Sequence, residues 1–145
     1  MLKNKPIIFI ISILLIGLGI YTLYQSPTKT TPTENLSTIE ELTQDSKVIN
    51  YVKTHHQLPD YYITKSKAKK LGWEPSKGNL CEVLPNRAIG GDRFGNRERQ
   101  LPKDKIYFEA DVNYNCGRRG ADRIIYTKTG EVWLTKNHYK TLKKQ

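Results

Sequence analysis

Three hydropathy patterns follow one another along the chain. The first is a run without charged side chains from Pro6 to Tyr24, which two lysines precede. Its length approaches the roughly 20 residues that cross a bilayer, and it is apolar on every side rather than along one helical stripe. We therefore expect residues 1–25 to form a signal peptide or a transmembrane signal anchor, with the lysine end in the cytoplasm. No small-x-small cleavage site follows, which favours the anchor.

The second pattern is polar and has no period. The stretch Ser26–Thr38 is rich in Ser, Thr and Pro, a composition typical of flexible linkers. Residues 26–44 are therefore predicted to tether a folded domain to the N-terminal segment.

The third pattern covers residues 45–145 and predicts one folded domain. Apolar residues at helical spacing indicate a helix over Asp45–His56. Two shorter helices are expected over Lys65–Leu71 and Leu80–Leu84, with Thr64 and Asn79 as candidate N-caps. Strand-like segments rich in β-branched and aromatic residues follow at 106–114, 122–127 and 131–136. Helices first and antiparallel strands second predict an α+β domain, with N-terminal helices packed on a twisted antiparallel sheet.

Charge adds information about partners. The chain holds 24 basic and 14 acidic residues, and residues 1–46 contribute only three of the basic ones. The predicted domain is therefore the basic part, which favours a polyanionic partner such as nucleic acid, anionic lipid or cell-wall polymer.

Two cysteines, Cys81 and Cys116, stand apart from any CxxC motif, so a zinc site is not expected. In an exported chain, two cysteines more often form one disulfide.

A carboxylate, a histidine and arginines fall on the predicted strands and their connections. Glu109 and Asp111 alternate onto one face of a strand, and Arg123 on the next strand could reach that face. Glu109 and His138 could pass protons in opposite directions during RNA cleavage, with Arg119 and Arg123 stabilising the phosphorane. From spacing alone, a plain ion pair is the competing interpretation.

Six motifs, in order, fill most of residues 47–145. They are QLPDYYITKSKAKKLGW (57–73), SKGNL (76–80), IGGDRFGNRE (89–98), EADVNY (109–114), ADRIIY (121–126) and NHY (137–139). Together they resemble the barnase-like family of guanyl-preferring ribonucleases that bacilli secrete. The resemblance implies the microbial ribonuclease fold. It also implies metal-independent cleavage of single-stranded RNA 3′ of guanosine, through a 2′,3′-cyclic phosphate that is then hydrolysed.

The resemblance assigns roles residue by residue. Glu109 matches the general base and His138 the general acid. The cations around the scissile phosphate match Lys65, Arg119 and Arg123. The guanine-site residues match Phe94, Asn96, Arg97, Glu98 and Tyr139, with the Glu98 carboxylate accepting from N1–H and N2–H₂ of the base. No metal or cofactor is implied.

Two departures from the family are visible. Arg118 stands where the family has an aromatic residue. Its charge could make an additional contact to phosphate, or it could be a solvated surface charge. The family's namesake has no cysteine, but the elements that hold Cys81 and Cys116 pack together in its fold, so a Cys81–Cys116 disulfide is predicted.

Two other functions were weighed against this one. A non-enzymatic binder of RNA or wall polymer would have no use for Glu109 beside a phosphate, since the carboxylate repels it. A toxin delivered to rival cells would need a delivery domain. We expect a monomer that acts outside the cell, either secreted or tethered to the membrane through its N-terminal helix. The resemblance also implies an acidic, barstar-like inhibitor protein in the cytoplasm.

Overall fold

The computed structural model describes residues 37–145, so the predicted signal peptide or anchor lies outside the described residues. Among residues 37–145, no helix is long and apolar enough to cross a bilayer.

The predicted linker does not extend to residue 44, because helix α2 (Ile39–Leu42) lies inside that range. Thr38 and Glu41 form a reciprocal capping box at its start. The Thr38 hydroxyl accepts from the Glu41 N–H at 3.2 Å, and the Glu41 carboxylate accepts from the Thr38 N–H at 3.3 Å. Ile39 is buried in the core. The Thr-x-x-Glu capping box and the burial of Ile39 therefore stabilise a helix within a segment whose composition predicts a linker.

The three predicted helices are present, and each ends one residue earlier than expected. They are α3 (Asp45–His55), α4 (Lys65–Lys70) and α5 (Leu80–Val83). Thr64 caps α4 as predicted, accepting from the Lys67 N–H. Asn79 occupies the N-cap position of α5 as predicted, but its side chain makes no capping hydrogen bond and bonds the backbone of Gly72 and Glu74 instead.

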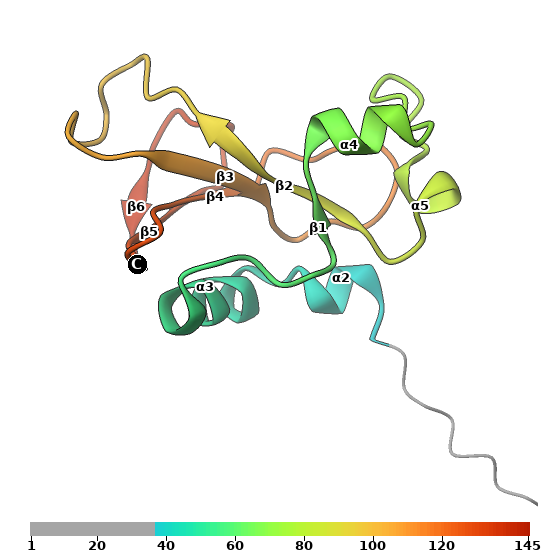
Figure 1. The fold of residues 1–145 in the computed structure, drawn as a ribbon, viewed down its shortest axis with the longest axis horizontal. Coiled ribbons are helices and arrows are strands. Elements are labelled where there is room, and N and C mark those ends of the chain that lie inside the picture. The colour runs from blue at the N-terminus through green and yellow to red at the C-terminus, as the bar shows by residue number, and fades with distance from the viewer. Residues whose placement is uncertain (1–36) are drawn as a thin grey trace, which may run out of the picture. The chain divides into compact units, whose positions relative to one another are not determined.

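Six strands form one sheet in the order β1-β2-β3-β4-β5-β6 (Figure 1). They are β1 (Tyr62–Ile63), β2 (Ala88–Phe94), β3 (Tyr107–Asp111), β4 (Arg123–Tyr126), β5 (Val132–Thr135) and β6 (Lys143–Lys144). The expected wholly antiparallel sheet is corrected in one respect, because β1 pairs with β2 in parallel. A parallel pair needs a crossover connection, and the chain between β1 and β2 supplies it through α4 and α5.

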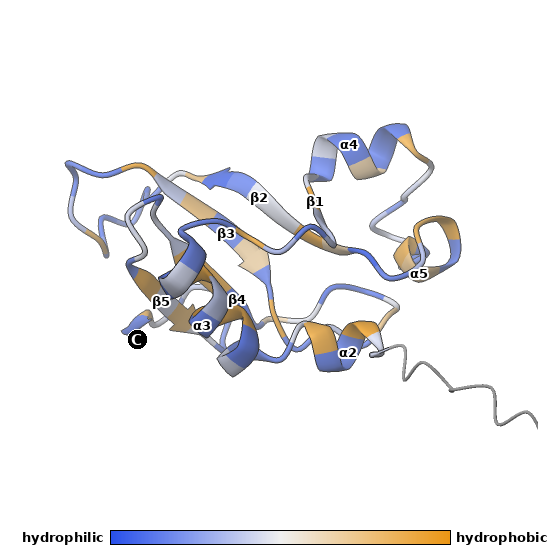
Figure 2. Cartoon of the chain, turned by 60° about the horizontal axis from the view of Figure 1, so that its bottom comes forward, coloured by the Kyte–Doolittle hydropathy of each residue, from blue (hydrophilic) through white to orange (hydrophobic). Residues whose placement is uncertain are grey.

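The main core lies between α3 and one face of the sheet. Val48, Ile49 and Val52 on α3 pack against Ala110 and Ile124. Figure 2 shows the apolar colouring of β4 and β5 beside α3. A second cluster under α2, α4 and α5 contains Ile39, Ala68, Trp73, Leu80, Ala88, Ile89 and Tyr114. The opposite face of the sheet carries a smaller apolar cluster of Leu101, Tyr107, Ile125 and Trp133. The polar side chains of the sheet lie on this same face.

The predicted disulfide is present and joins Cys81 on α5 to Cys116, with their Cα atoms 5.7 Å apart. It pins the loop after β3 to the second cluster. The two cysteines are 35 residues apart in sequence. In the chain-entropy model, closing a loop of that size stabilises the fold by about 3–4 kcal/mol.

We expect the double replacement Cys81→Ser and Cys116→Ser to lower the free energy of unfolding by about 3–4 kcal/mol. Urea unfolding followed by tryptophan fluorescence measures this loss. Wild-type protein treated with reductant serves as the control and should lose the same amount. A loss below about 1 kcal/mol in both samples contradicts the prediction.

Candidate active site

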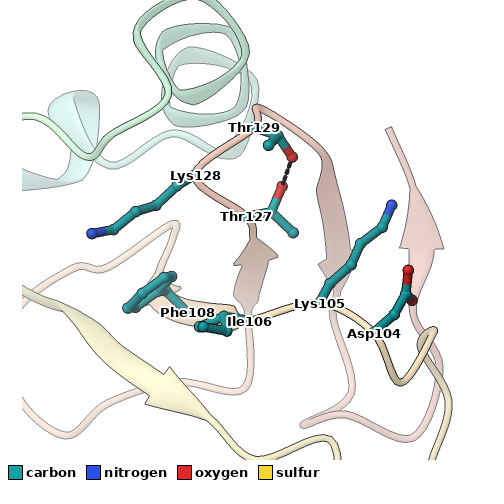
Figure 3. Close-up of a pocket in the computed structure, with 7 residues that line it drawn as sticks. All are labelled: Asp104, Lys105, Ile106, Phe108, Thr127, Lys128 and Thr129. Atoms are coloured by element: carbon teal, nitrogen blue, oxygen red, sulfur yellow. Dashed lines mark hydrogen bonds between the residues drawn. The ribbon is translucent and has the colours of Figure 1, made fainter.

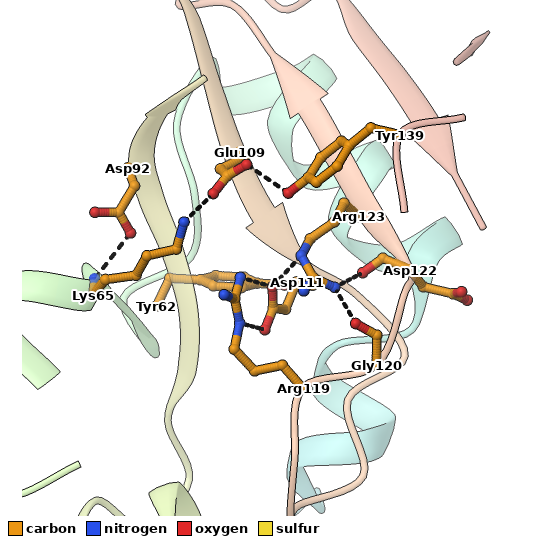
Figure 4. A network of polar contacts seen from close by, with 10 residues as sticks. All are labelled: Tyr62, Lys65, Asp92, Glu109, Asp111, Arg119, Gly120, Asp122, Arg123 and Tyr139. Carbon is orange, nitrogen blue, oxygen red and sulfur yellow. Dashed lines mark hydrogen bonds and ion pairs between the residues drawn. The ribbon is translucent and has the colours of Figure 1, made fainter. Parts of the chain in front are cut away.

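Strand β3 contributes side chains to both faces of the sheet, the core face and the polar face. Side chains alternate along a strand, so Ala110 faces α3 while Glu109 and Asp111 face the other way. Glu109 pairs with Asp92 on β2, and Asp111 pairs with Arg123 on β4. The polar face therefore collects acidic and basic side chains from three adjacent strands, as Figure 4 shows.

Glu109 is buried and held by two donors. Its Oε1 pairs with the Lys65 ammonium, and its Oε2 accepts from the Tyr139 hydroxyl at 2.6 Å. Burial raises the pKa of Glu109, but hydrogen bonds from Lys65 and Tyr139 and the charges of Lys65 and Arg119 outweigh it. The net pKa lies below the ordinary value, so the carboxylate is ionised at neutral pH and ready to accept a proton.

We expect Tyr139→Phe to raise the pKa of Glu109, because the hydroxyl donates to the ionised carboxylate and favours it. If Glu109 is the base, activity falls at low pH as its carboxylate becomes protonated, and this acidic limb of the pH–rate profile should move to higher pH. Steady-state kcat/KM measured between pH 3 and 7 tests this. An unchanged or lowered acidic limb contradicts the assignment of that limb to Glu109.

Asp111 anchors both predicted arginines from its buried position at the end of β3. Arg119 binds it through two hydrogen bonds of 2.6 Å, from Nε and from a terminal amino group. Arg123 Nε lies at an ion-pair distance of 2.8 Å from Asp111, although its N–H does not point at the oxygen. Another amino group of Arg123 donates to the Gly120 and Asp122 carbonyls. Asp111 thus fixes two cations at one end of the polar face.

Lys65 is positioned by the start of helix α4. Its backbone N–H donates to the Asp92 carboxylate at 2.9 Å, so a β2 side chain holds the first residue of the helix. A carboxylate at a helix N-terminus is favoured by the unpaired N–H groups and the helix dipole. The Lys65 ammonium then reaches across β2 to Glu109.

His138 is exposed and lies in an unusual turn after β5. His138 and Tyr139 both have positive φ, at 53° and 67°, which non-glycine residues adopt rarely. The buried Thr135 hydroxyl accepts from the Tyr139 N–H at 3.0 Å, and Asn137 bonds both Thr135 and Thr141. These contacts hold two consecutive left-handed residues in a turn that leaves the His138 side chain exposed, and backbone strain of this kind is typical of functional positions.

One cleft of about 740 Å³ contains the predicted base, the predicted acid and the predicted guanine loop. Its lining includes Lys65, Phe94, Asn96, Arg97, Glu98, Glu109, His138 and Tyr139. The Phe94 and Tyr139 rings lie 5.4 Å apart between centroids and form one aromatic wall. The Asn96 side chain closes the loop with two hydrogen bonds to the backbone of Leu101.

A second cleft, of about 490 Å³, lies on the other side of His138. It is lined by Pro75, Ser76, Arg118, Arg119, Gly120, Arg123 and His138. The structure therefore divides the predicted site residues between two clefts that share His138. Among residues 37–145, no three His, Cys, Asp or Glu side chains gather closely enough to hold a metal ion.

Sequence reasoning missed two residues of this site. Asp92 lies on β2, which was not predicted to be a strand because two glycines interrupt its pattern. Asp111 was placed on the correct face, but its binding of Arg119 and Arg123 was not foreseen. The sequence did hold one indication, because residues at i and i+2 of a strand share a face and Asp111 stands two residues after Glu109.

A third hollow, of about 380 Å³, shares no lining residue with either cleft. Figure 3 shows the residues that line it. Exposed Ile106 and half-buried Phe108 form an apolar floor, and Lys128 Nζ lies 5.5 Å from the centre of the Phe108 ring. Its lining contains one carboxylate, Asp104, but no histidine, so it lacks the pair of proton-transfer groups found in the first cleft.

The sheet carries clefts lined by basic side chains, a buried carboxylate and an exposed imidazole. Basic clefts attract anions, so this arrangement is typical of proteins that act on anionic substrates. A family model described as ribonuclease matches residues 45–145. The ribonuclease of Bacillus intermedius is 44% identical over 111 residues, which cover 75% of this chain and 68% of the relative. The ribonuclease of Bacillus pumilus gives the same values. The ribonuclease of Heyndrickxia coagulans is 49% identical over 96 residues, or 65% of this chain and 88% of that protein.

The chain belongs to this ribonuclease family. It is an RNA-cleaving enzyme with an α+β fold, and the predicted family resemblance is confirmed. The individual roles of the site residues and the base preference stay predictions.

Proposed function

We propose that this ribonuclease cleaves single-stranded RNA on the 3′ side of guanosine, with Glu109 as general base and His138 as general acid. The observation that supports this most is that an ionised, buried carboxylate and an exposed imidazole line one cleft together with Lys65. Arg119 and Arg123 line the adjoining cleft, which shares His138 with the first. General acid–base pairs of this kind supply about 10²–10⁴ in rate.

In the proposed first step, Glu109 takes the proton of the 2′-hydroxyl, and the 2′-oxygen forms a bond to phosphorus. The bond from phosphorus to the 5′-oxygen breaks, and His138 gives its proton to that leaving oxygen. Lys65, Arg119 and Arg123 stabilise the extra negative charge of the phosphorane between these events. The products are a 2′,3′-cyclic phosphate and a free 5′-hydroxyl.

In the proposed second step the roles reverse. His138, now neutral, takes a proton from water while the water oxygen attacks phosphorus. Glu109, now protonated, gives its proton to the 2′-oxygen as that bond breaks. Both residues then return to their starting protonation states.

Guanine preference would come from Glu98 and the loop that Asn96 closes. Guanine presents N1–H and N2–H₂ side by side, so one carboxylate accepts both hydrogen bonds. Adenine lacks this pair and would leave the carboxylate without partners, at a cost of about 1–3 kcal/mol or more. The aromatic wall of Phe94 and Tyr139 offers a stacking surface for the base.

Incubation with an RNA oligomer that contains a single guanosine, in excess EDTA, tests the proposed reaction. We expect one cut after that guanosine, a 2′,3′-cyclic phosphate end, and no cut when that nucleoside is 2′-deoxy. Cleavage at many bases, or with a 5′-phosphate product, contradicts the proposal.

The guanine site has its own test. We expect Glu98→Ala to lower kcat/KM at guanosine sites by about tenfold to 100-fold, since that carboxylate carries the discrimination. Activity at adenosine sites should change little. The exposed Glu82 on α5, replaced by alanine, is the matched loss of one acidic charge. If both variants keep the wild-type ratio of guanosine to adenosine cleavage, Glu98 does not read the base.

The proposed setting is outside the cytoplasm. A disulfide persists in oxidising environments, and this chain forms one. We also propose an acidic cytoplasmic inhibitor as partner, because the net charge of +10 and the cationic clefts offer a complementary surface.

A further inference from the structure

A basic groove lies along the loop of residues 95–106, which connects β2 to β3 (Figure 1). The groove has a volume of about 530 Å³, and none of the residues that line it is acidic. Lys105 in its lining forms an ion pair with Glu131. The other cations of the lining are exposed and form no ion pair within residues 37–145: Arg93, Arg97, Arg99 and Lys103. A hollow with so many unneutralised charges of one sign attracts anions.

The backbone of Arg99 is strained. Its φ of 53° is left-handed, a conformation that glycine adopts without steric cost and arginine adopts rarely. The Arg99 N–H donates to the Asn96 carbonyl at 3.0 Å, and the Asn96 side chain bonds both the N–H and the carbonyl of Leu101. These contacts fix the turn that carries Arg99. Strain that the surrounding structure enforces is typical of functional positions, which favours a role for the Arg99 side chain.

Lys103 belongs to a second fixed segment of the groove. Leu101 and Tyr107 are buried in one apolar cluster, so both ends of this segment are anchored. The Tyr107 hydroxyl also donates to the Pro102 carbonyl at 2.9 Å, directly before Lys103. Because the backbone around both cations is already held, little ordering of the chain is needed when an anion binds.

The groove adjoins the first cleft, because the two share lining residues of the guanine loop: Arg93, Phe94, Gly95, Asn96 and Arg97. The direction of the substrate then follows from the proposed function, on which this inference rests. The leaving nucleotide departs on the side of His138, which does not line the groove. The RNA on the 5′ side of the guanosine must therefore leave the first cleft elsewhere, and the shared wall leads it to a cationic surface.

We propose that the groove binds phosphates of the RNA strand on the 5′ side of the guanosine, with Arg99 and Lys103 as the main contacts. A guanidinium binds phosphate oxygens through two parallel charge-assisted hydrogen bonds, and an ammonium binds them as a point charge. Contacts to phosphate carry no sequence information, so the identity of the preceding nucleotides should not matter. With this groove, the enzyme cleaves after a guanosine inside a strand faster than after one at a 5′ end.

The test compares cleavage of GpU and of UpUpGpU by the full chain. Both substrates have the same scissile bond and the same leaving uridine, so a difference between them arises on the 5′ side of the guanosine alone. We expect wild-type kcat/KM to be about tenfold higher for UpUpGpU, from contacts to charged groups. A UpUpGpU whose two upstream phosphates are uncharged methylphosphonates should show no gain, because charge and not base stacking supplies it.

Variants assign the gain to the groove. The double replacement Arg99→Gln and Lys103→Gln should lose most of the gain on UpUpGpU. It should cleave GpU within about twofold of wild type, because exposed positions outside a contact contribute little. The matched control, Lys69→Gln and Lys70→Gln, removes two exposed positive charges from α4 and should keep the gain.

Salt dependence gives a second measure that a purely structural effect would not move. The slope of log kcat/KM for UpUpGpU against log salt should be shallower by about 1.4 in the groove double variant, or about 0.7 for each lost phosphate contact to a single strand. The slope for GpU should be the same in both proteins.

Several results overturn the proposal. Equal wild-type kcat/KM for GpU and UpUpGpU excludes a contact to RNA on the 5′ side of the guanosine. A gain that survives in the groove double variant assigns the groove to a different anion, and equal losses on both substrates assign the two cations to the guanine loop or to the fold. If wild-type protein cleaves neither substrate, the proposed function fails, which is distinct from a failure of the groove.

Discussion

Replacing Glu109 with glutamine is expected to lower kcat for RNA cleavage by about 10²–10⁴, because the amide cannot take the proton of the 2′-hydroxyl. KM should not rise. The carboxylate repels the substrate phosphate, and its removal frees the Lys65 ammonium that it now pairs with. Single-turnover cleavage of a guanosine-containing oligomer measures the chemical step directly.

Glutamine is a better replacement for Glu109 than alanine, because it preserves more of the contacts that Glu109 makes with its neighbours. The amide oxygen can still accept from the Tyr139 hydroxyl, so the buried site keeps most of its shape. Asp104→Asn, at an exposed position outside the cleft, is the matched loss of one carboxylate. A Glu109→Gln enzyme with kcat within tenfold of wild type removes Glu109 from the role of base.

Replacing His138 with alanine is expected to lower kcat by a similar factor of about 10²–10⁴, because the leaving 5′-oxygen then departs without a proton. His138 is exposed, so its loss should leave the free energy of unfolding almost unchanged. The alkaline limb of the pH–rate profile should also disappear, since that limb reports deprotonation of the acid. Rates between pH 4 and 9, with urea unfolding in parallel, test both statements.

The chain offers a natural control for this replacement. Of its three histidines, His55 is exposed at the end of α3, far along the sequence from the cleft residues. His55→Ala should cleave RNA at the wild-type rate. Equal losses in the two variants, or a retained alkaline limb in His138→Ala, would show that His138 is not the acid.

The elements with strong local patterns were predictable from the sequence. Helix α3 has apolar residues at helical spacing, and β4 and β5 have β-branched and aromatic residues on either side of a turn at Gly130. In each case local propensity and burial favour the same structure. The placement of Glu109 and Asp111 on one face followed from strand alternation alone.

Other elements depend on contacts that local patterns do not reveal. Strand β2 contains Gly90 and Gly91, which weaken a strand signal. Gly90 is required there, since an added Cβ would lie 2.6 Å from the Tyr62 ring and 2.7 Å from Ala110. The parallel pairing of β1 is likewise decided by a crossover that only the assembled fold defines.

The fine geometry of the site was the least predictable part. Tyr139 was expected only to line the base site, but its hydroxyl also bonds Glu109. Burial and the Glu109 carboxylate raise the pKa of Tyr139 well above its usual value, so it stays a donor. Both this contact and the exposure of His138 depend on two consecutive left-handed residues, which no residue type in Asn-His-Tyr dictates.

The cations of the site are held in place by acidic side chains of the same chain. Asp111 holds Arg119 and Arg123, and Asp92 holds the start of α4 and with it Lys65. In the proposed reaction, charges fixed in this way would need little reorganisation when the phosphorane forms, and such preorganisation is a main source of electrostatic catalysis. The acidic residues around the cleft therefore position the cations.

The most direct test of the two proton-transfer roles uses a substrate whose leaving 5′-oxygen is replaced by sulfur. A thiolate leaves without a proton, so the general acid becomes unnecessary while the base is still required. We predict that His138→Ala cleaves this substrate within about tenfold of wild type, and that Glu109→Gln stays slower by about 10²–10⁴. Equal recovery of both variants, or of neither, would contradict the assignment of base and acid.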